Sequence, residues 1–202
     1  MKVAQGAEGG ENMKLFTNGN KKIGSDTITF NMTAAMSCPA DKAGLCPLSK
    51  VCYAKKSERQ YPSVVAHREY QAKFWEETSV GGFITAFEKY CGKKLKSGKI
   101  KYMRFSESGD FRCQADVERV SEIANILHER YNIITYLYTH RRDLDFTNRC
   151  KWLIVNGSGF MIDNEFRTVK TLSGSNATCK GNCRECNLCK MHGNKVIEVL
   201  LH

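Results

Sequence analysis

The sequence lacks any long hydrophobic run. No stretch of about 18 apolar residues occurs in the chain of 202 residues, so we expect no membrane-spanning helix and no membrane partner. Residues 1–20, which include GAEGGEN, also lack the apolar centre of a secretory signal. We therefore expect a mobile leader at the start of the chain and a location in the cytoplasm.

Acidic residues are too few to balance the basic ones. The chain has 31 Lys and Arg against 21 Asp and Glu, which gives a formal net charge of +10. Such a surplus suits a polyanionic partner, so it points to nucleic acid or to a phosphorylated substrate. The plainer alternative is a basic protein whose charge only keeps it in solution.

Disulfides are not expected, because no secretory signal directs the chain to an oxidising compartment. Ten cysteines are nevertheless present, and seven of them fall into two groups. In a reducing compartment, cysteine clusters point to metal or redox chemistry. The first group is Cys38, Cys46 and Cys52, and the second group is Cys179, Cys183, Cys186 and Cys189.

The first group directly follows a mostly apolar run at 28–36 and is interrupted by proline and glycine. Its spacings, x7 and x5, fit no simple zinc rule. Three thiolates would leave one iron of a [4Fe-4S] cluster open to a further ligand. The alternative is three ordinary buried thiols, although the prolines and glycine argue against a packed core segment.

The second group has the spacing C-x3-C-x2-C-x2-C. A structural zinc usually takes two separated cysteine pairs, whereas this spacing is closer to iron–sulfur packing. Both a second [4Fe-4S] cluster and a zinc ion remain open for these four cysteines.

Hydrophobic periodicity predicts alternating strands and helices. The predicted strands are 27–32, 100–105, 133–138, 152–155, 166–172 and 195–201, and the predicted helices are 62–77, 83–89, 115–131 and 144–150. This alternation favours an α/β fold with a mostly parallel sheet, either open or a partial (β/α) barrel. We expect a leader and arm at 1–26, a cluster-binding core at 27–172, and a Cys-rich segment with a closing strand at 173–202.

Polar loops follow the predicted strands and should gather at the carboxyl edge of the sheet, where ligands bind in such folds. They are the first cysteine group, SESGDF at 106–111, THRR at 139–142 and NGSG at 156–159. His140 and Arg141 could hold a carboxylate or phosphate, or form a solvated basic loop. Asn156 and Ser158 could contact a ribose, or form a plain glycine turn.

Cys52-Tyr53-Ala54 after two earlier cysteines, followed by SESGDF after the next strand, resembles the radical S-adenosylmethionine (SAM) superfamily. More closely, the stretch 15–189 resembles the phage gene product 88-like proteins. The resemblance implies that the first group ligates three irons of a [4Fe-4S] cluster and that SAM chelates the fourth. It also implies that Ser106, Glu107, Ser108, Gly109 and Asp110 hold the SAM amino group, with Glu107 or Asp110 accepting bonds from the ammonium.

The superfamily's usual spacing is CxxxCxxC, which the first group does not have and which Cys179, Cys183 and Cys186 do have. We interpret the first group as the catalytic centre, because it follows a strand ahead of SESGDF, and the second as auxiliary.

The main functional hypothesis is a radical SAM-type enzyme in the host cytoplasm that uses an electron donor and modifies a nucleic acid or nucleotide. A second hypothesis is a non-enzymatic phage protein in which zinc or iron–sulfur staples support nucleic-acid binding. A third is an enzyme that uses a cluster for sulfur transfer or as a Lewis acid, without SAM. The sequence identifies no catalytic residue beyond the cofactor ligands.

Overall fold

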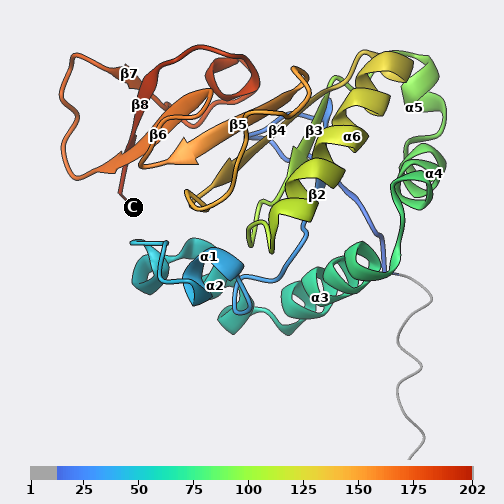
Figure 1. Ribbon diagram of the computed structural model, residues 1–202, viewed down its shortest axis with the longest axis horizontal. Coiled ribbons are helices and arrows are strands. Elements are labelled where there is room, and N and C mark those ends of the chain that lie inside the picture. Colours follow the sequence, from blue (N-terminus) through green and yellow to red (C-terminus); the bar gives the residue numbers. More distant parts are fainter. Residues whose placement is uncertain (1–12, 202) are drawn as a thin grey trace, which may run out of the picture.

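The fold is built on a single eight-stranded sheet (Figure 1). The computed structural model describes residues 13–201, so residues 1–12 of the predicted leader lie outside the described residues. The prediction is wrong for the rest of it, because Phe16 is completely buried and Thr17–Asn18 pairs with the sheet. The strands are β1 (Thr17–Asn18), β2 (Thr27–Phe30), β3 (Tyr102–Phe105), β4 (Ile134–Thr139), β5 (Leu153–Ser158), β6 (Asn164–Val169), β7 (Ala177–Thr178) and β8 (Val196–Leu200). The α-helices are α1 (Pro39–Lys42), α2 (Tyr53–Gln60), α3 (Pro62–Glu77), α4 (Val80–Cys91), α5 (Lys93–Lys96) and α6 (Gln114–Tyr131), and the 3-10 turns are η1 (Ser49–Val51) and η2 (Leu188–Lys190).

The strand order is β1-β2-β3-β4-β5-β6-β8-β7, and every neighbouring pair except β1 and β2 is parallel. The edge strands β1 and β7 do not pair with each other, so the sheet is open. This confirms the predicted α/β class with a mostly parallel sheet. Within residues 13–201, no helix has the length and apolar character needed to cross a membrane.

Most predicted elements are present with small shifts at their ends. The helix predicted at 62–77 is α3, which begins at Pro62 as a proline-led first turn should. The helix predicted at 144–150 is wrong, because this segment forms turns. There the Asp145 carboxylate accepts hydrogen bonds from the backbone and hydroxyl of Thr147, at 2.8 and 2.7 Å, which competes with helix formation. Predicted loop residues 156–158 instead continue β5.

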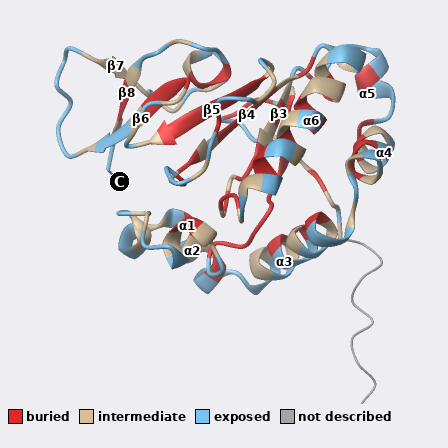
Figure 2. Cartoon of the chain, in the orientation of Figure 1, coloured by how far each residue is buried: buried red, intermediate tan, exposed pale blue. Residues whose placement is uncertain are grey.

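The helices α3, α4 and α6 bury one face of the sheet. The core on this side is rich in aromatic rings, and Phe30 contacts Trp75, Phe83 and Phe105 with ring centroids 5.1–5.9 Å apart. Figure 2 shows the central strands as buried, while the outer surfaces of the helices are exposed. Alternate strand residues therefore point into this core, and the residues between them point to the opposite, inner face of the sheet.

The Cys-rich segment packs on the inner face of the sheet. Cys189 of η2 is buried with Tyr136 and Ile154, and partly buried aromatic residues of β3, β4 and β6 surround them. The strand β8 lies between β6 and β7, so residues 173–201 complete the main sheet. The sequence predicts a Cys-rich segment with a closing strand here, and β8 is that strand.

Candidate metal and cofactor site

The loops that follow β2, β3 and β4 meet at the carboxyl edge of the sheet, as predicted. The Thr33 hydroxyl accepts a hydrogen bond from the backbone N–H of Asp110 at 3.2 Å, which joins the first two loops. The Asp110 carboxylate accepts bonds from the Thr139 hydroxyl at 2.6 Å and from the His140 backbone N–H at 2.8 Å, which joins the third. This edge is where the sequence placed the candidate site.

Asp110 is almost completely buried at this junction, with 3 % of its surface exposed. Burial raises the pKa of its carboxyl to about 6, while the hydrogen bonds from Thr139, His140 and Phe111 act in the opposite direction. The predicted role of Asp110 was to accept bonds from a SAM ammonium. In the structure, its carboxylate accepts three hydrogen bonds from within the protein, and the predicted contact with SAM stays a prediction.

The first cysteine group is held by a buried ion pair. Cys38 immediately precedes α1 and Cys52 immediately precedes α2. The Glu58 carboxylate accepts hydrogen bonds from the backbone N–H groups of Ala35 at 2.6 Å and Met36 at 2.9 Å, just ahead of Cys38. Glu58 also pairs with Arg68 of α3 at 3.0 Å, and both side chains are buried. Helices α2 and α3 therefore fix the start of the cysteine loop.

The thiols of this group act on one another electrostatically, Cys46 on Cys38 and Cys52 on Cys46. The pKa of Cys38 is raised to about 11, mainly by burial, and the charges of Asp110 and Cys46 act in the same direction. Burial also raises the pKa of Cys46, with Cys52 and Asp110 among the groups that add to the shift. Thiols with raised pKa values are protonated at neutral pH, so binding a metal would have to release these protons.

The loop 106–110 has unusual features for a plain turn. Ser106 has a φ of 54°, a left-handed conformation that is uncommon for serine. The hydroxyls of Ser106 and Ser108 are buried, and neither has a hydrogen-bond partner among the described residues. Buried polar groups are nearly always paired in native proteins, so these hydroxyls are suited to bonding a polar ligand. Glu107 is half-buried beside them, and its carbonyl accepts a bond from the Tyr53 hydroxyl at 2.5 Å.

The predicted residues after β4 have mainly internal partners. The Arg141 guanidinium bonds both oxygens of Asp143 at 2.8 Å and the carbonyls of Phe111 and Arg112 at 2.5 and 3.0 Å. The His140 ring is half-buried, and burial, helped by the charge of Arg142, lowers its pKa. Arg141 thus has little capacity left for an added carboxylate or phosphate.

The predicted ribose contacts from β5 lie in different surroundings. The side-chain amide of Asn156 donates hydrogen bonds to the carbonyls of Leu137 and Cys189, at 3.0 Å each. Its carbonyl accepts a bond from Asn164 at 3.0 Å. Asn156 is completely buried, and its bond to Cys189 ties the Cys-rich segment to the sheet. Ser158, at the end of β5, is half-buried.

All four cysteines of the second group line one small cavity, together with Tyr138 and Phe166. Burial raises the pKa of Cys183 and of Cys189, and a hydrogen bond with Tyr138 opposes the shift at Cys189. The cavity lies on the inner face of the sheet, whereas the first group lies at the carboxyl edge beside Asp110. The structure thus places the two groups in two separate surroundings.

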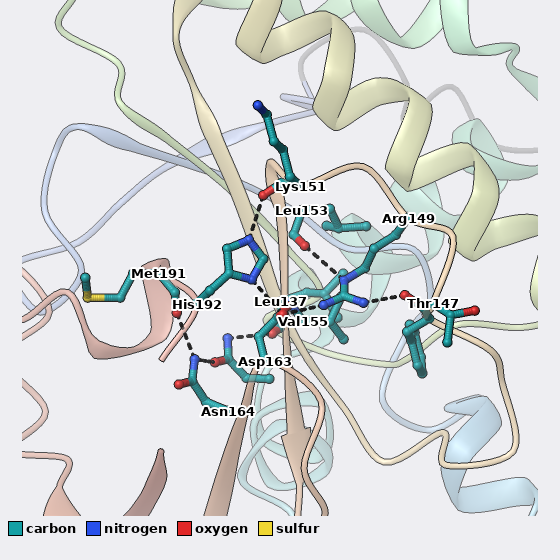
Figure 3. A network of polar contacts seen from close by, with 12 residues as sticks. Leu137, Thr147, Arg149, Lys151, Leu153, Val155, Asp163, Asn164, Met191 and His192 are labelled. Carbon is teal, nitrogen blue, oxygen red and sulfur yellow. Dashed lines mark hydrogen bonds and ion pairs between the residues drawn. The ribbon is translucent and has the colours of Figure 1, made fainter. Parts of the chain in front are cut away.

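A polar network anchors the chain immediately after the second group (Figure 3). The Asp163 carboxylate pairs with Arg149 and with His192, whose Nδ1 lies 2.6 Å away, and it accepts the Val155 backbone N–H at 2.8 Å. The Asn164 side chain donates to the carbonyl of Met191 at 2.9 Å. These bonds fix the cysteine segment against β5 and β6.

Within residues 13–201, no three Cys, His, Asp or Glu side chains converge closely enough to hold a single metal ion. A four-ligand zinc site requires such convergence, since each zinc–sulfur distance is about 2.3 Å. A [4Fe-4S] cluster spreads its cysteine ligands over several irons, so its sulfurs need not meet at one point. The first group and the loop that carries the two unpaired serine hydroxyls follow adjacent strands at the same edge of the sheet.

Several residues of the site were not identified from the sequence. Glu58, Asn31 and Gln71 belong to the framework: the Asn31 carbonyl accepts the Ser108 N–H at 2.8 Å, and its amide donates to Gln71 at 2.9 Å. Arg104 was read only as part of a strand. An arginine at an inner-face position of a central strand is a signal that period-two alternation could have revealed.

The family model described as Gene product 88 matches residues 7–158. The matched range contains all three cysteines of the first group and the loop 106–110, and it ends before the second group. No curated protein and no solved structure matches the chain.

Proposed function

The chain belongs to the gene product 88 family, and we propose that this phage protein binds an iron–sulfur cluster through Cys38, Cys46 and Cys52 and holds SAM beside it. The family match supports the gene product 88 part of the resemblance that the sequence indicated. The radical SAM part is our proposal, and it depends on the site rather than on the family.

The observation that carries the proposal is the pairing of two features at one edge of the sheet. The Cys38 and Cys46 thiols are close enough to Asp110 for its charge to act on both, and the adjoining loop has two buried serine hydroxyls without partners among the described residues. SAM carries an ammonium and a carboxylate on its amino-acid part, and both groups form hydrogen bonds with hydroxyls. A cluster with one iron free of protein ligands supplies an open coordination position and an electron.

Each residue of the candidate site has a distinct role in the proposed function. The Ser106 and Ser108 hydroxyls bond the polar end of the cofactor, and the Glu107 carboxylate faces its ammonium. Asp110 acts as a positioning residue, because its carboxylate joins the loops that follow β3 and β4. The second group holds an auxiliary [4Fe-4S] cluster or a zinc ion, which secures the Cys-rich segment against the sheet.

The test is an iron and sulfide count with a visible absorption spectrum on the anaerobically purified protein. We expect a brown protein, loss of iron from the first centre in Cys38→Ala, and separate loss of the auxiliary metal in Cys183→Ala. Cys91→Ala is the matched control, since Cys91 is a buried thiol in the helical core. A colourless protein that contains zinc alone, or a C38A variant with unchanged iron, would contradict the proposal.

Cofactor binding is tested separately by equilibrium dialysis with SAM. Ser106→Ala and Ser108→Ala should weaken SAM binding while leaving the iron content unchanged, because neither hydroxyl is a cluster ligand. If SAM binds neither the protein nor these variants while iron is present, a cluster enzyme that works without SAM becomes the better account.

A further inference from the structure

Arg104 is a charged residue on the inner face of the sheet. Its neighbours in β3, Met103 and Phe105, point into the helical core, so Arg104 points to the opposite face. Among residues 13–201, its guanidinium forms no hydrogen bond or ion pair, and its Nε is buried without a partner.

A second unpaired group lies next to it. Tyr136 of β4 is in register with Arg104. Tyr136 is 1 % exposed, and its hydroxyl is also buried without a partner. The guanidinium carbon lies 5.5 Å from the ring centre of Tyr138, which supports the cation but supplies no acceptor. Two unpaired donors from adjacent strands thus occupy one region of the inner face.

No carboxylate of the described residues forms an ion pair with this arginine. Glu107 acts on its charge only at longer range, because no ion pair joins the two side chains. Arginine stays charged at all accessible pH values, and the Arg104 side chain is half-buried with its Nε shielded from water, which is costly for a group without a partner. Cys183 and Cys189 also interact with this charge only at longer range, and no described side chain bonds the Arg104 Nε. Native proteins pair nearly all such groups, so an anion from outside the described chain suits this position.

We propose that Arg104 and the Tyr136 hydroxyl form an oxyanion site on the inner face of the sheet, for the phosphate or carboxylate of a ligand other than SAM. The planar guanidinium fits either group through two parallel hydrogen bonds. Arg104 lies two residues before Ser106, so the bound ligand adjoins the proposed cofactor site. Naming this ligand as an anionic substrate rests on the proposed function, whereas binding of the oxyanion does not.

The test measures binding of inorganic phosphate and of acetate to the full-length, metal-loaded protein by calorimetry. We expect saturable binding by the wild type and at least about tenfold weaker binding by Arg104→Met, because charge-assisted hydrogen bonds are lost. The phosphate and acetate arms show which oxyanion the site prefers. Arg130→Met is the matched control, since the Arg130 side chain is 55 % exposed and pairs with Glu88 on the helical surface.

Tyr136→Phe keeps the test decisive if the Arg104 variant does not fold. Removing a buried hydroxyl that has no partner should leave the urea midpoint unchanged or raise it, while oxyanion affinity falls. The proposal is overturned if neither anion binds, which would leave ordered water as the partner, or if R130M loses as much affinity as R104M.

SAM binding separates this site from the cofactor site. The R104M variant should bind SAM as the wild type does; a loss of SAM affinity without any phosphate or acetate binding would assign Arg104 to the cofactor and overturn the proposal. Conversely, oxyanion binding by a wild-type protein that holds no iron at the first cysteine group would support this site although the proposed function had failed.

Discussion

Gly109 lies at the contact between the cysteine loop and the loop that follows β3. It has a φ of 76°, and a Cβ placed on it would lie 1.9 Å from the Thr33 hydroxyl oxygen and 2.5 Å from the Thr33 carbonyl oxygen. Gly109→Ala should therefore lower the free energy of unfolding by more than the roughly 1–2 kcal/mol that a left-handed alanine costs. Urea denaturation with a two-state fit measures the loss.

Gly98→Ala is the matched control for this change. Gly98 also has a positive φ, of 63°, but nothing lies within 4 Å of its Cβ position. It should show only the backbone cost of about 1–2 kcal/mol. Equal losses in the two variants would mean that the contact with Thr33 does not constrain the loop.

The raised pKa of Asp110 predicts a pH dependence of stability. Its pKa is about 6 in the folded chain, mainly because of burial, against about 3.9 in an unfolded chain. A raised pKa favours the protonated form in the fold, so the contribution of Asp110 to stability is fully present below pH 4 and is lost as the pH rises to about 6. The change amounts to about 3 kcal/mol in total.

Asp110→Asn should reduce this slope between pH 4 and 6, because the amide does not ionise. The variant will also be less stable overall, since an amide nitrogen cannot accept the His140 N–H. Urea midpoints of the metal-free, reduced proteins across this range provide the measurement. Parallel curves for the wild type and D110N would show that another group causes the pH dependence.

At the residue scale, the sequence located the candidate site but not its internal bonding. The cysteines and the loop 106–110 stood out because their residue types and spacing are distinctive. The partners of Asp110 and Arg141 could not be found in this way, since hydrogen bonds between loops depend on which strands become neighbours. Arg141 in particular reads as a free cation in the sequence, yet it pairs with Asp143 two residues later.

At the scale of elements, α2 supports the cysteine loop through one buried side chain. Glu58→Ala would leave the Arg68 charge buried and unpaired, and it would free two backbone N–H groups ahead of Cys38. We expect a loss of about 3–5 kcal/mol in unfolding free energy, with reduced iron retention by the first group. Urea denaturation and iron counts on the same samples test both effects.

Glu77→Ala is the comparison, because the Glu77 side chain is 66 % exposed and forms only a loose pair with Lys73 at 3.9 Å. It should change stability by no more than about 0.5 kcal/mol. If E58A were equally mild, the ion pair with Arg68 would not be what fixes the loop.

The positions of the helices and strands were largely predictable because most carry clear periodicity. α6 has apolar residues at helical spacing, and it ends at Tyr131, followed by Asn132, whose left-handed φ of 55° suits the residue after a helix. The helix predicted at 144–150 was wrong because its apolar pattern is weak and the hydrogen bonds from Thr147 to Asp145 favour a turn. β5 exceeded its predicted end because Asn156 is fully paired inside the sheet, which a polar residue type does not indicate.

At the scale of the whole molecule, the Cys-rich segment belongs to the main sheet. A chain that ends at residue 172 would lack β8, which pairs with β6, and η2, which covers Tyr136 and Ile154. We expect this shortened chain to lose cooperative unfolding, as followed by circular dichroism in urea. A shortened chain with an unchanged urea midpoint would instead show that residues 27–172 form an independent core.

The strand order was the part of the fold least accessible from the sequence. The parallel class follows from alternating strands and helices, but the placement of β8 between β6 and β7 follows from long-range pairing. Only the folded chain shows that the second cysteine group covers the inner face while the first group lies at its edge. The spacing of the cysteines alone therefore could not show whether the two groups lie together or apart in the fold.

The late position of β8 in the chain also affects how the protein folds while the ribosome synthesises it. β6 emerges about 30 residues before the strand that pairs with it, and at translation speeds of 5–20 residues per second that interval lasts on the order of seconds. During this time the backbone N–H and C=O groups along one edge of β6 are unpaired and can bond a strand of another chain. Chaperones that shield nascent chains, or early capture of metal by the intervening cysteines, would therefore influence how much protein matures correctly.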